Sequence, residues 1–92
     1  MRRLLVLAAA LLLLAGCGGG PAVSGRAVFS HSCSGCHTLT GHDTNVDGGD
    51  LAVGHFSVAE VESFAAVMPV RPRLTSDELH AVAVYVVSRQ TR

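Results

Sequence analysis

The residues with the clearest chemical meaning form the run Cys33-Ser34-Gly35-Cys36-His37. Two cysteines two residues apart and a histidine directly after them match the C-x-x-C-H motif of c-type haem attachment. In that chemistry the two thiols add to the two vinyl groups of one haem. The histidine is then held under the porphyrin plane, where its imidazole reaches the iron. The motif predicts covalent haem c on Cys33 and Cys36, with His37 as one axial ligand.

The other face of the iron needs a second ligand, and we expect it to be Met68. It is the only methionine after Met1. Pro69 follows it and favours an extended backbone, which presents the thioether away from the chain. A lone methionine is more often a gap-filler in a core, but the upstream motif favours ligation. His55 is the alternative, and histidine in place of methionine would lower the reduction potential.

Three further histidines are expected to face solvent without a role. His31 lies two residues before the first motif cysteine, on the side of a predicted helix away from the thioethers. His42 falls in a glycine-rich loop, and His80 lies beside Glu78 on the last predicted helix.

The first sixteen residues have the form of an export signal. Arg2 and Arg3 precede an unbroken apolar stretch from Leu4 to Leu14. That stretch is too short to span a bilayer, which takes about 20 residues, but it suits a secretory signal peptide. The segment ends Leu14-Ala15-Gly16-Cys17, which resembles the lipobox of bacterial lipoproteins. The resemblance implies cleavage before Cys17 and lipidation of its thiol; the alternative is an ordinary signal with an incidental cysteine.

These features divide the chain into a signal peptide (1–16), a lipidated N-terminus with a flexible tether (17–24) and a folded domain (25–92). The run Gly18-Gly19-Gly20-Pro21 suits a tether, because glycine leaves the backbone free and proline ends regular structure. The domain would therefore be exported and held at a bacterial membrane by lipid, on the outer face of the cell membrane or on the periplasmic side. Which membrane holds it stays open.

Composition agrees with a small cofactor protein. The chain has 92 residues, which suits one domain at most, and only four aromatic residues and no tryptophan. A core this thin gains from an apolar cofactor. From Cys17 onward, five arginines face seven acidic residues, a net charge of −2, and there is no lysine. This charge balance excludes both the basic surface of a nucleic-acid-binding protein and a polybasic patch for membrane binding.

Local signals predict an all-α domain of about three helices. Ser24 is a plausible N-cap for a helix over 25–33, and the glycine-rich stretch 38–54 is predicted to be loop. Ser57 and Glu60 form a capping box that opens a second helix, which the Met68-Pro69 step ends. Thr75 and Glu78 form another capping box. The helix that it opens should run to about Ser88, with an apolar stripe at helical spacing: Leu79, Val82, Ala83 and Val86.

Residues 25–90 resemble the small bacterial class I cytochromes c, which carry one haem. Five features arrive in the family's order: Gly25, Phe29 four residues later, the C-x-x-C-H motif, Met68-Pro69, and an acidic-capped helix carrying Tyr85. The resemblance implies a cytochrome c-like fold in which the first and last helices cross. Gly25 then permits close contact, and Phe29, Val82 and Tyr85 lie at the crossing.

The resemblance also implies a function. A mono-haem protein with both axial positions filled is a one-electron carrier between redox proteins, such as a membrane oxidase, reductase or dehydrogenase. We expect a monomer that is not itself an enzyme and that docks through a small, largely apolar patch at the exposed haem edge.

Two departures from the family pattern stand out. Family members usually carry a proline soon after the haem histidine, whose carbonyl accepts the Nδ1 proton, yet no proline lies between His37 and Met68. A loop carbonyl near Asp50 or Leu51 must replace it. The loop is also short, which should expose a haem edge and lower the potential somewhat. Arg71 and Arg73 either pair with a haem propionate or face solvent.

Two other classes of function stay open. In one, Met68 dissociates and the iron becomes an enzyme or sensor site for peroxide or gases. In the other, Cys33 and Cys36 serve a non-haem role, as a disulfide or as part of a zinc site with His37 and His42. The spacing is awkward for zinc, and a thioredoxin-like site would need a βαβ context that the pattern lacks.

Overall fold

The computed structural model describes residues 22–91. The predicted signal peptide, Cys17 and most of the tether lie outside the described residues, as does Arg92. Three α-helices and one 3₁₀ turn follow in order: α2 (Gly25–Ser32), η1 (Leu51–Val53), α3 (Val58–Ala66) and α4 (Ser76–Arg89). The part of the chain described has no β-strand, so the predicted all-α class is confirmed. None of these helices has the length and apolar character needed to cross a membrane.

Side-chain caps fix where each helix begins, as the sequence predicts. The Ser24 hydroxyl accepts a hydrogen bond from the Ala27 N–H at the start of α2. The Ser57–Glu60 pair opens α3, and the Thr75–Glu78 pair opens α4, each as a complete capping box. These caps satisfy N–H groups that have no partner within the first helical turn. The C-terminal ends of α2 and α4, at Ser32 and Arg89, each differ by one residue from the predicted ends at Cys33 and Ser88.

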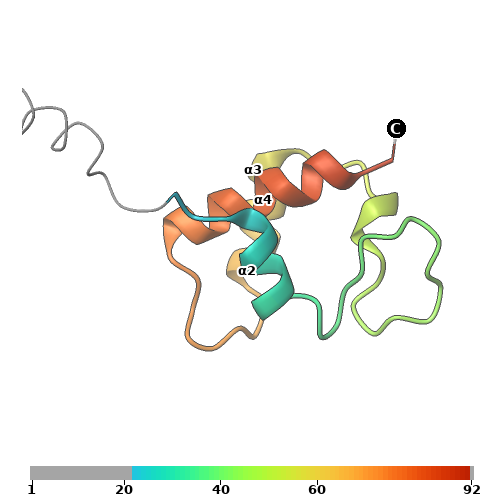
Figure 1. The fold of residues 1–92 in the computed structure, drawn as a ribbon, viewed down its shortest axis with the longest axis horizontal. Coiled ribbons are helices and arrows are strands. Elements are labelled where there is room, and N and C mark those ends of the chain that lie inside the picture. The colour runs from blue at the N-terminus through green and yellow to red at the C-terminus, as the bar shows by residue number, and fades with distance from the viewer. Residues whose placement is uncertain (1–21, 92) are drawn as a thin grey trace, which may run out of the picture.

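Helix α4 is the central element, packing against α2 on one side and α3 on another (Figure 1). Its predicted apolar stripe supplies much of the core, because Val82, Ala83 and Val86 are all buried. The remaining core residues are Val28 and Phe29 from α2, Val61 from α3 and Ala52 from η1. Each helix thus turns one apolar face inward, as an amphipathic helix in a small domain must.

The crossing of α2 over α4 depends on a missing side chain. A Cβ atom built on Gly25 would overlap the carbonyl oxygen of Ala81 and lie 2.7 Å from Tyr85 Cβ. Beside this contact the rings of Phe29 and Tyr85 pack with centroids 6.0 Å apart. The expected crossing at Gly25, Phe29 and Tyr85 is confirmed, with Val82 buried in the core next to it.

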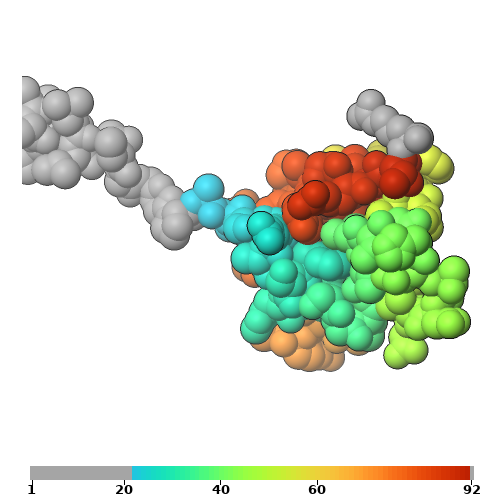
Figure 2. Space-filling model, turned by 45° about the vertical axis from the view of Figure 1, so that its right-hand side comes forward, coloured from blue at the N-terminus to red at the C-terminus, as the bar shows by residue number. Residues whose placement is uncertain are grey.

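The loop between α2 and α3 has more order than the sequence predicts. Residues Thr38 and Asp50 form an isolated parallel bridge, in which the Leu51 N–H donates to the Thr38 carbonyl at 2.9 Å. Asp50 then caps η1 through the Ala52 N–H. The loop forms a lobe beside α2 and below the C-terminal half of α4, shown in green in Figures 1 and 2.

The close α2–α4 contact predicts how adding one methyl group at Gly25 changes the stability of the protein. In an open helix position, Gly25→Ala would favour folding, because alanine has the higher helix propensity. Here we expect it to destabilise the protein by about 1–3 kcal/mol through overpacking. Thermal and urea unfolding of the purified protein measure the change. Gly35→Ala is the control, because a Cβ there meets nothing within 4 Å. Equal stability of the two variants would contradict the close crossing.

Candidate functional site

A cavity of about 330 Å³ lies among the end of α2, the loop, α3 and α4. Its size falls in the range of cofactor and ligand sites, about 300–1,000 Å³. Most of its lining is apolar and comes from segments far apart in the chain: Leu51, Phe56, Val61, Phe64, Ala65, Val82 and Val86. The other lining residues are Gly48 and three that carry possible ligand atoms, Cys33, His37 and Met68.

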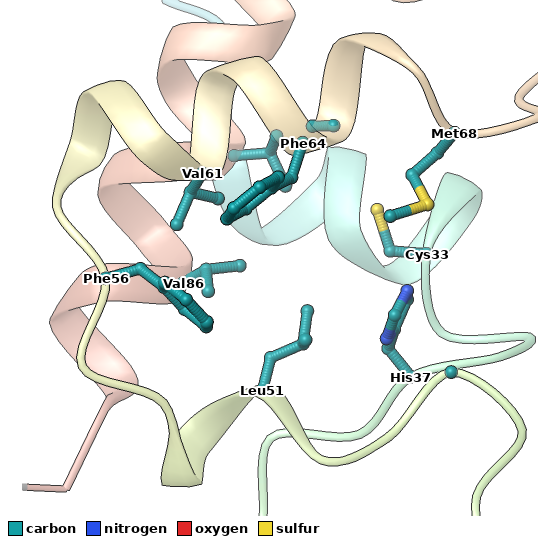
Figure 3. Close-up of a pocket in the computed structure, with 11 residues that line it drawn as sticks. Cys33, His37, Leu51, Phe56, Val61, Phe64, Met68 and Val86 are labelled. Atoms are coloured by element: carbon teal, nitrogen blue, oxygen red, sulfur yellow. The ribbon is translucent and has the colours of Figure 1, made fainter.

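The structure brings three of the predicted site residues together in this cavity. Figure 3 shows Met68, Cys33 and His37 along one side of the cavity, with Met68 reaching in from above, His37 from below and Cys33 between them in this view. Val61, Phe56 and Val86 lie across the cavity from them. A thiol, an imidazole and a thioether are therefore the lining groups able to bond a haem or its iron, in an otherwise apolar space.

The backbone of the loop holds the His37 ring in place. Its Nδ1 donates a long hydrogen bond of 3.3 Å to the Gly49 carbonyl. With the proton on Nδ1, the Nε2 lone pair is free to bind a metal. A Cβ on Gly48 would lie 2.5 Å from Cε1 of the ring, so glycine is required for the loop to pass this close. Gly49 thus supplies the acceptor, next to the pair Asp50 and Leu51 near which a loop carbonyl was predicted to take this role.

Met68 reaches the cavity from the segment just after α3. The helix ends at Ala66, ahead of the Met68-Pro69 step, as predicted. The Met68 N–H still donates to the Ala65 carbonyl at 3.3 Å, which ties the residue to the last turn. Its side chain lines the cavity while keeping 43% of its surface exposed. Met68 therefore lies at the edge of the cavity, between its interior and solvent.

The remaining histidines do not line this cavity. His55, the alternative ligand, is exposed. His31, His42 and His80 are also exposed, as expected. His80 contacts Glu62 across the α3–α4 interface and not its helix neighbour Glu78. Among residues 22–91, His37 is the histidine that the fold directs into the cavity.

The two motif cysteines lie in different environments. Cys33 is half-buried and lines the cavity, and burial raises the pKa of its thiol. Cys36 is exposed and lies outside the lining, and both thiols are free. No group of three or more His, Cys, Asp or Glu side chains within the described chain is placed to hold a metal ion. The zinc alternative therefore has no preassembled ligand set in residues 22–91.

Sequence reasoning gave no role to the side chain of Asp50, which the structure places at the centre of the loop. Only 7% of its surface is exposed. Burial raises the pKa of this carboxyl, and hydrogen bonds from three N–H groups and one hydroxyl outweigh burial, so its pKa falls to about 2. An aspartate directly before a short apolar run is an N-cap signal that could have identified it.

The side chains present fit a c-type haem. The cavity offers an apolar space whose lining includes the first motif thiol, the His37 ring and the Met68 thioether, and the second motif thiol, Cys36, lies exposed outside the lining. Comparison of the chain with protein-family profiles, with curated proteins and with solved structures found no match.

The Asp50 carboxylate predicts an acid-sensitive loop. Its pKa is lowered in the folded protein from the ordinary 3.8 to about 2. Its contribution to stability is therefore complete above about pH 4 and is lost as the pH falls toward 2. Urea unfolding of the native chain and of Asp50→Asn, at pH values across this window, measures the contribution.

We expect the native chain to be the more stable at neutral pH and its advantage over Asp50→Asn to shrink on acidification. Asp47→Asn is the matched control, because Asp47 is exposed in the same loop. A stability difference between the native chain and Asp50→Asn that stays constant with pH would contradict the assignment.

Proposed function

We propose that this chain is an exported, lipid-anchored mono-haem c-type cytochrome that carries one electron at a time between redox proteins. The observation that supports this most directly is the convergence of Cys33, His37 and Met68 on one apolar cavity. These residues come from the end of α2, the following turn and the segment after α3. The sequence motif alone does not require Met68 to line the same cavity as His37.

In this proposal Cys33 and Cys36 would hold the haem through thioether bonds, and His37 and Met68 would bind its iron. The bound haem supplies an iron that exchanges a single electron without bond rearrangement in the protein. His37 is held by the Gly49 carbonyl, which orients its ring and raises its basicity as a ligand. With both axial positions taken by side chains, no coordination site is left for oxygen or peroxide, which favours electron transfer over enzymatic chemistry.

The apolar lining has two further roles in the proposal. Val61, Val82 and Val86 are buried and keep water from the inner side of the cavity. Exclusion of water and methionine ligation both act on the reduction potential, and methionine raises it relative to histidine. At the outer side, Phe56 and Phe64 pack edge to face and stay partly exposed. The cavity therefore has an inner dry side and an outer side close to the surface.

That outer side suits contact with a redox partner. Phe56, Phe64, Val67 and Met68 are exposed apolar residues around or beside the cavity. They agree with the expected small apolar docking patch for a membrane oxidase, reductase or dehydrogenase. Arg71 and Arg73 are exposed in the segment that follows. Whether either arginine pairs with a propionate stays a prediction.

A second candidate has one observation in its favour. Met68 is 43% exposed and lies outside a regular helix. A ligand in that position can dissociate more readily than one in a packed core. The iron would then be open to small molecules, which is the chemistry of a peroxidase or a gas sensor. An optical spectrum distinguishes the two candidates.

The native protein, produced with a cytochrome maturation system, should give a low-spin spectrum with the ferric methionine–iron charge-transfer band. Met68→Ala should abolish that band and open the iron to carbon monoxide. Val67→Ala is the control, because Val67 is the highly exposed neighbour of the ligand. A band that survives in Met68→Ala would overturn the ligand assignment. A native protein that is high-spin and binds carbon monoxide readily would favour the second candidate.

The anchor makes a separate prediction. Cys17 is the proposed lipidation site, and Cys17→Ser should move the protein from the membrane fraction to the soluble fraction of the exported material. The reason is that two or more acyl chains are needed for stable anchoring, and they would be lost together. Fractionation followed by immunoblotting measures the change, with the Arg26→Gln variant as control. Retention of Cys17→Ser in the membrane fraction would contradict lipid anchoring at this residue.

A further inference from the structure

The loop that follows the haem motif is built around one buried carboxylate. Asp50 Oδ2 accepts hydrogen bonds from the Gly41 N–H at 2.7 Å, the Asp43 N–H at 3.1 Å and the Thr40 hydroxyl at 3.0 Å. Asp50 Oδ1 accepts a fourth from the Ala52 N–H at 3.0 Å. A carboxylate with four donors is a strong local constraint, because hydrogen bonds to a charged group are the stronger kind.

Three of these bonds connect the two ends of the loop, and the fourth, from the Ala52 N–H, caps η1 within the returning segment. The donors at residues 40–43 belong to the loop segment that leaves the haem motif. Asp50 and Ala52 belong to the segment that returns to the motif at η1. The Thr38–Asp50 bridge joins the same two segments through the backbone. His37 directly precedes Thr38 in the chain. Asp50 therefore helps to hold the returning segment close to His37.

Gly49 precedes Asp50 and carries the acceptor for the His37 ring. Its carbonyl accepts from His37 Nδ1 at 3.3 Å and from the Thr38 N–H at 3.4 Å. Both distances are long for hydrogen bonds, so a small shift of the loop would break them. Gly49 has a positive φ of 85°, which glycine adopts without strain. Shorter backbone bonds flank Gly49, from the Gly48 N–H to the Cys36 carbonyl at 2.6 Å and from the Leu51 N–H to the Thr38 carbonyl at 2.9 Å, and Asp50 adds side-chain bonds to this segment.

We propose that Asp50 is the positioning residue for the haem histidine: its carboxylate holds the Gly49 carbonyl against His37 Nδ1 and so sets the orientation and basicity of the ligand ring. This inference rests on the proposed function, because basicity matters only if His37 binds the iron. Asp50 itself touches neither the cavity nor His37.

The physical consequence has a definite sign. A carbonyl acceptor at Nδ1 makes the imidazole a better electron donor, which stabilises ferric iron. Loosening the loop weakens that hydrogen bond, so the ferric state loses stability and the midpoint potential rises. The Nδ1 proton also becomes more accessible and exchanges faster with solvent.

The test uses the holoprotein and begins with its visible spectrum. Absence of covalent haem in the native protein would remove the proposed function and is separate from the inference about Asp50. In protein that carries haem, the midpoint potential is measured by redox titration and the exchange of the His37 Nδ1 proton by NMR. Asp50→Asn should raise the potential and accelerate the exchange, because the amide NH₂ faces at least one of the four donors.

The matched control is Asp47→Asn, which removes an equal charge from an exposed position in the same loop. Removing negative charge near the haem raises the potential by electrostatics alone, and this variant measures that effect. The inference requires a larger rise in Asp50→Asn and faster proton exchange in that variant only. Equal potentials in the two variants, with unchanged exchange, would overturn it.

Thr40→Val covers the case in which Asp50→Asn does not fold. This variant removes the Thr40 hydroxyl, which lies 3.0 Å from Asp50 Oδ2, donates to Asp43 Oδ2 at 2.8 Å and accepts from the His42 N–H, and it leaves the Asp50 charge in place. It should shift potential and exchange in the same direction by a smaller amount. A folded Thr40→Val protein with native values for both would overturn the proposal.

Discussion

The absence of a side chain at Gly25 is the constraint on which the rest of the structure depends. It lets α2 lie directly against the backbone of α4 at Ala81, with the Phe29 ring packed at a tilt beside Tyr85. The motif residues begin at the C-terminal end of α2, where Cys33 is the cap residue. The helix crossing therefore determines where the first thiol and His37 meet the apolar face of α4. A side chain at position 25 would push α2 away and move the entire motif.

The other half of the site comes from two segments that approach from different directions. Helix α3 packs on α4 and ends at Ala66, and this end places Met68 at the cavity. The loop returns to the motif and brings the Gly49 carbonyl to the His37 ring. The position of Met68 thus depends on helix packing, and that of His37, the other proposed ligand, depends on a polar loop in which Asp50 accepts several hydrogen bonds. A small domain with few aromatic residues can build such a site because a cofactor would fill the space that its core leaves.

Much of this fold was accessible from sequence because the signals are local. The N-caps at Ser24, Ser57 and Thr75 act within one helical turn, and the apolar stripe of α4 follows a simple period. The helix crossing was also accessible, through a glycine that would be costly without a packing reason. The order within 38–54 was not predictable in this way. Its bonds join Asp50 to backbone N–H groups seven to nine positions earlier, and no periodic pattern encodes such pairs. The contact of Gly48 with the His37 ring and the pairing of His80 with Glu62 likewise depend on tertiary approach.

Covalent attachment of haem to this polypeptide is the central claim, and intact mass spectrometry of the denatured chain tests it most directly. The protein would be produced in a host with cytochrome maturation machinery and unfolded before measurement. The account predicts a chain heavier by the mass of one haem, and a Cys33→Ser, Cys36→Ser double variant without that added mass. A native chain that carries no haem after unfolding, under conditions in which a control cytochrome is matured, would contradict the account.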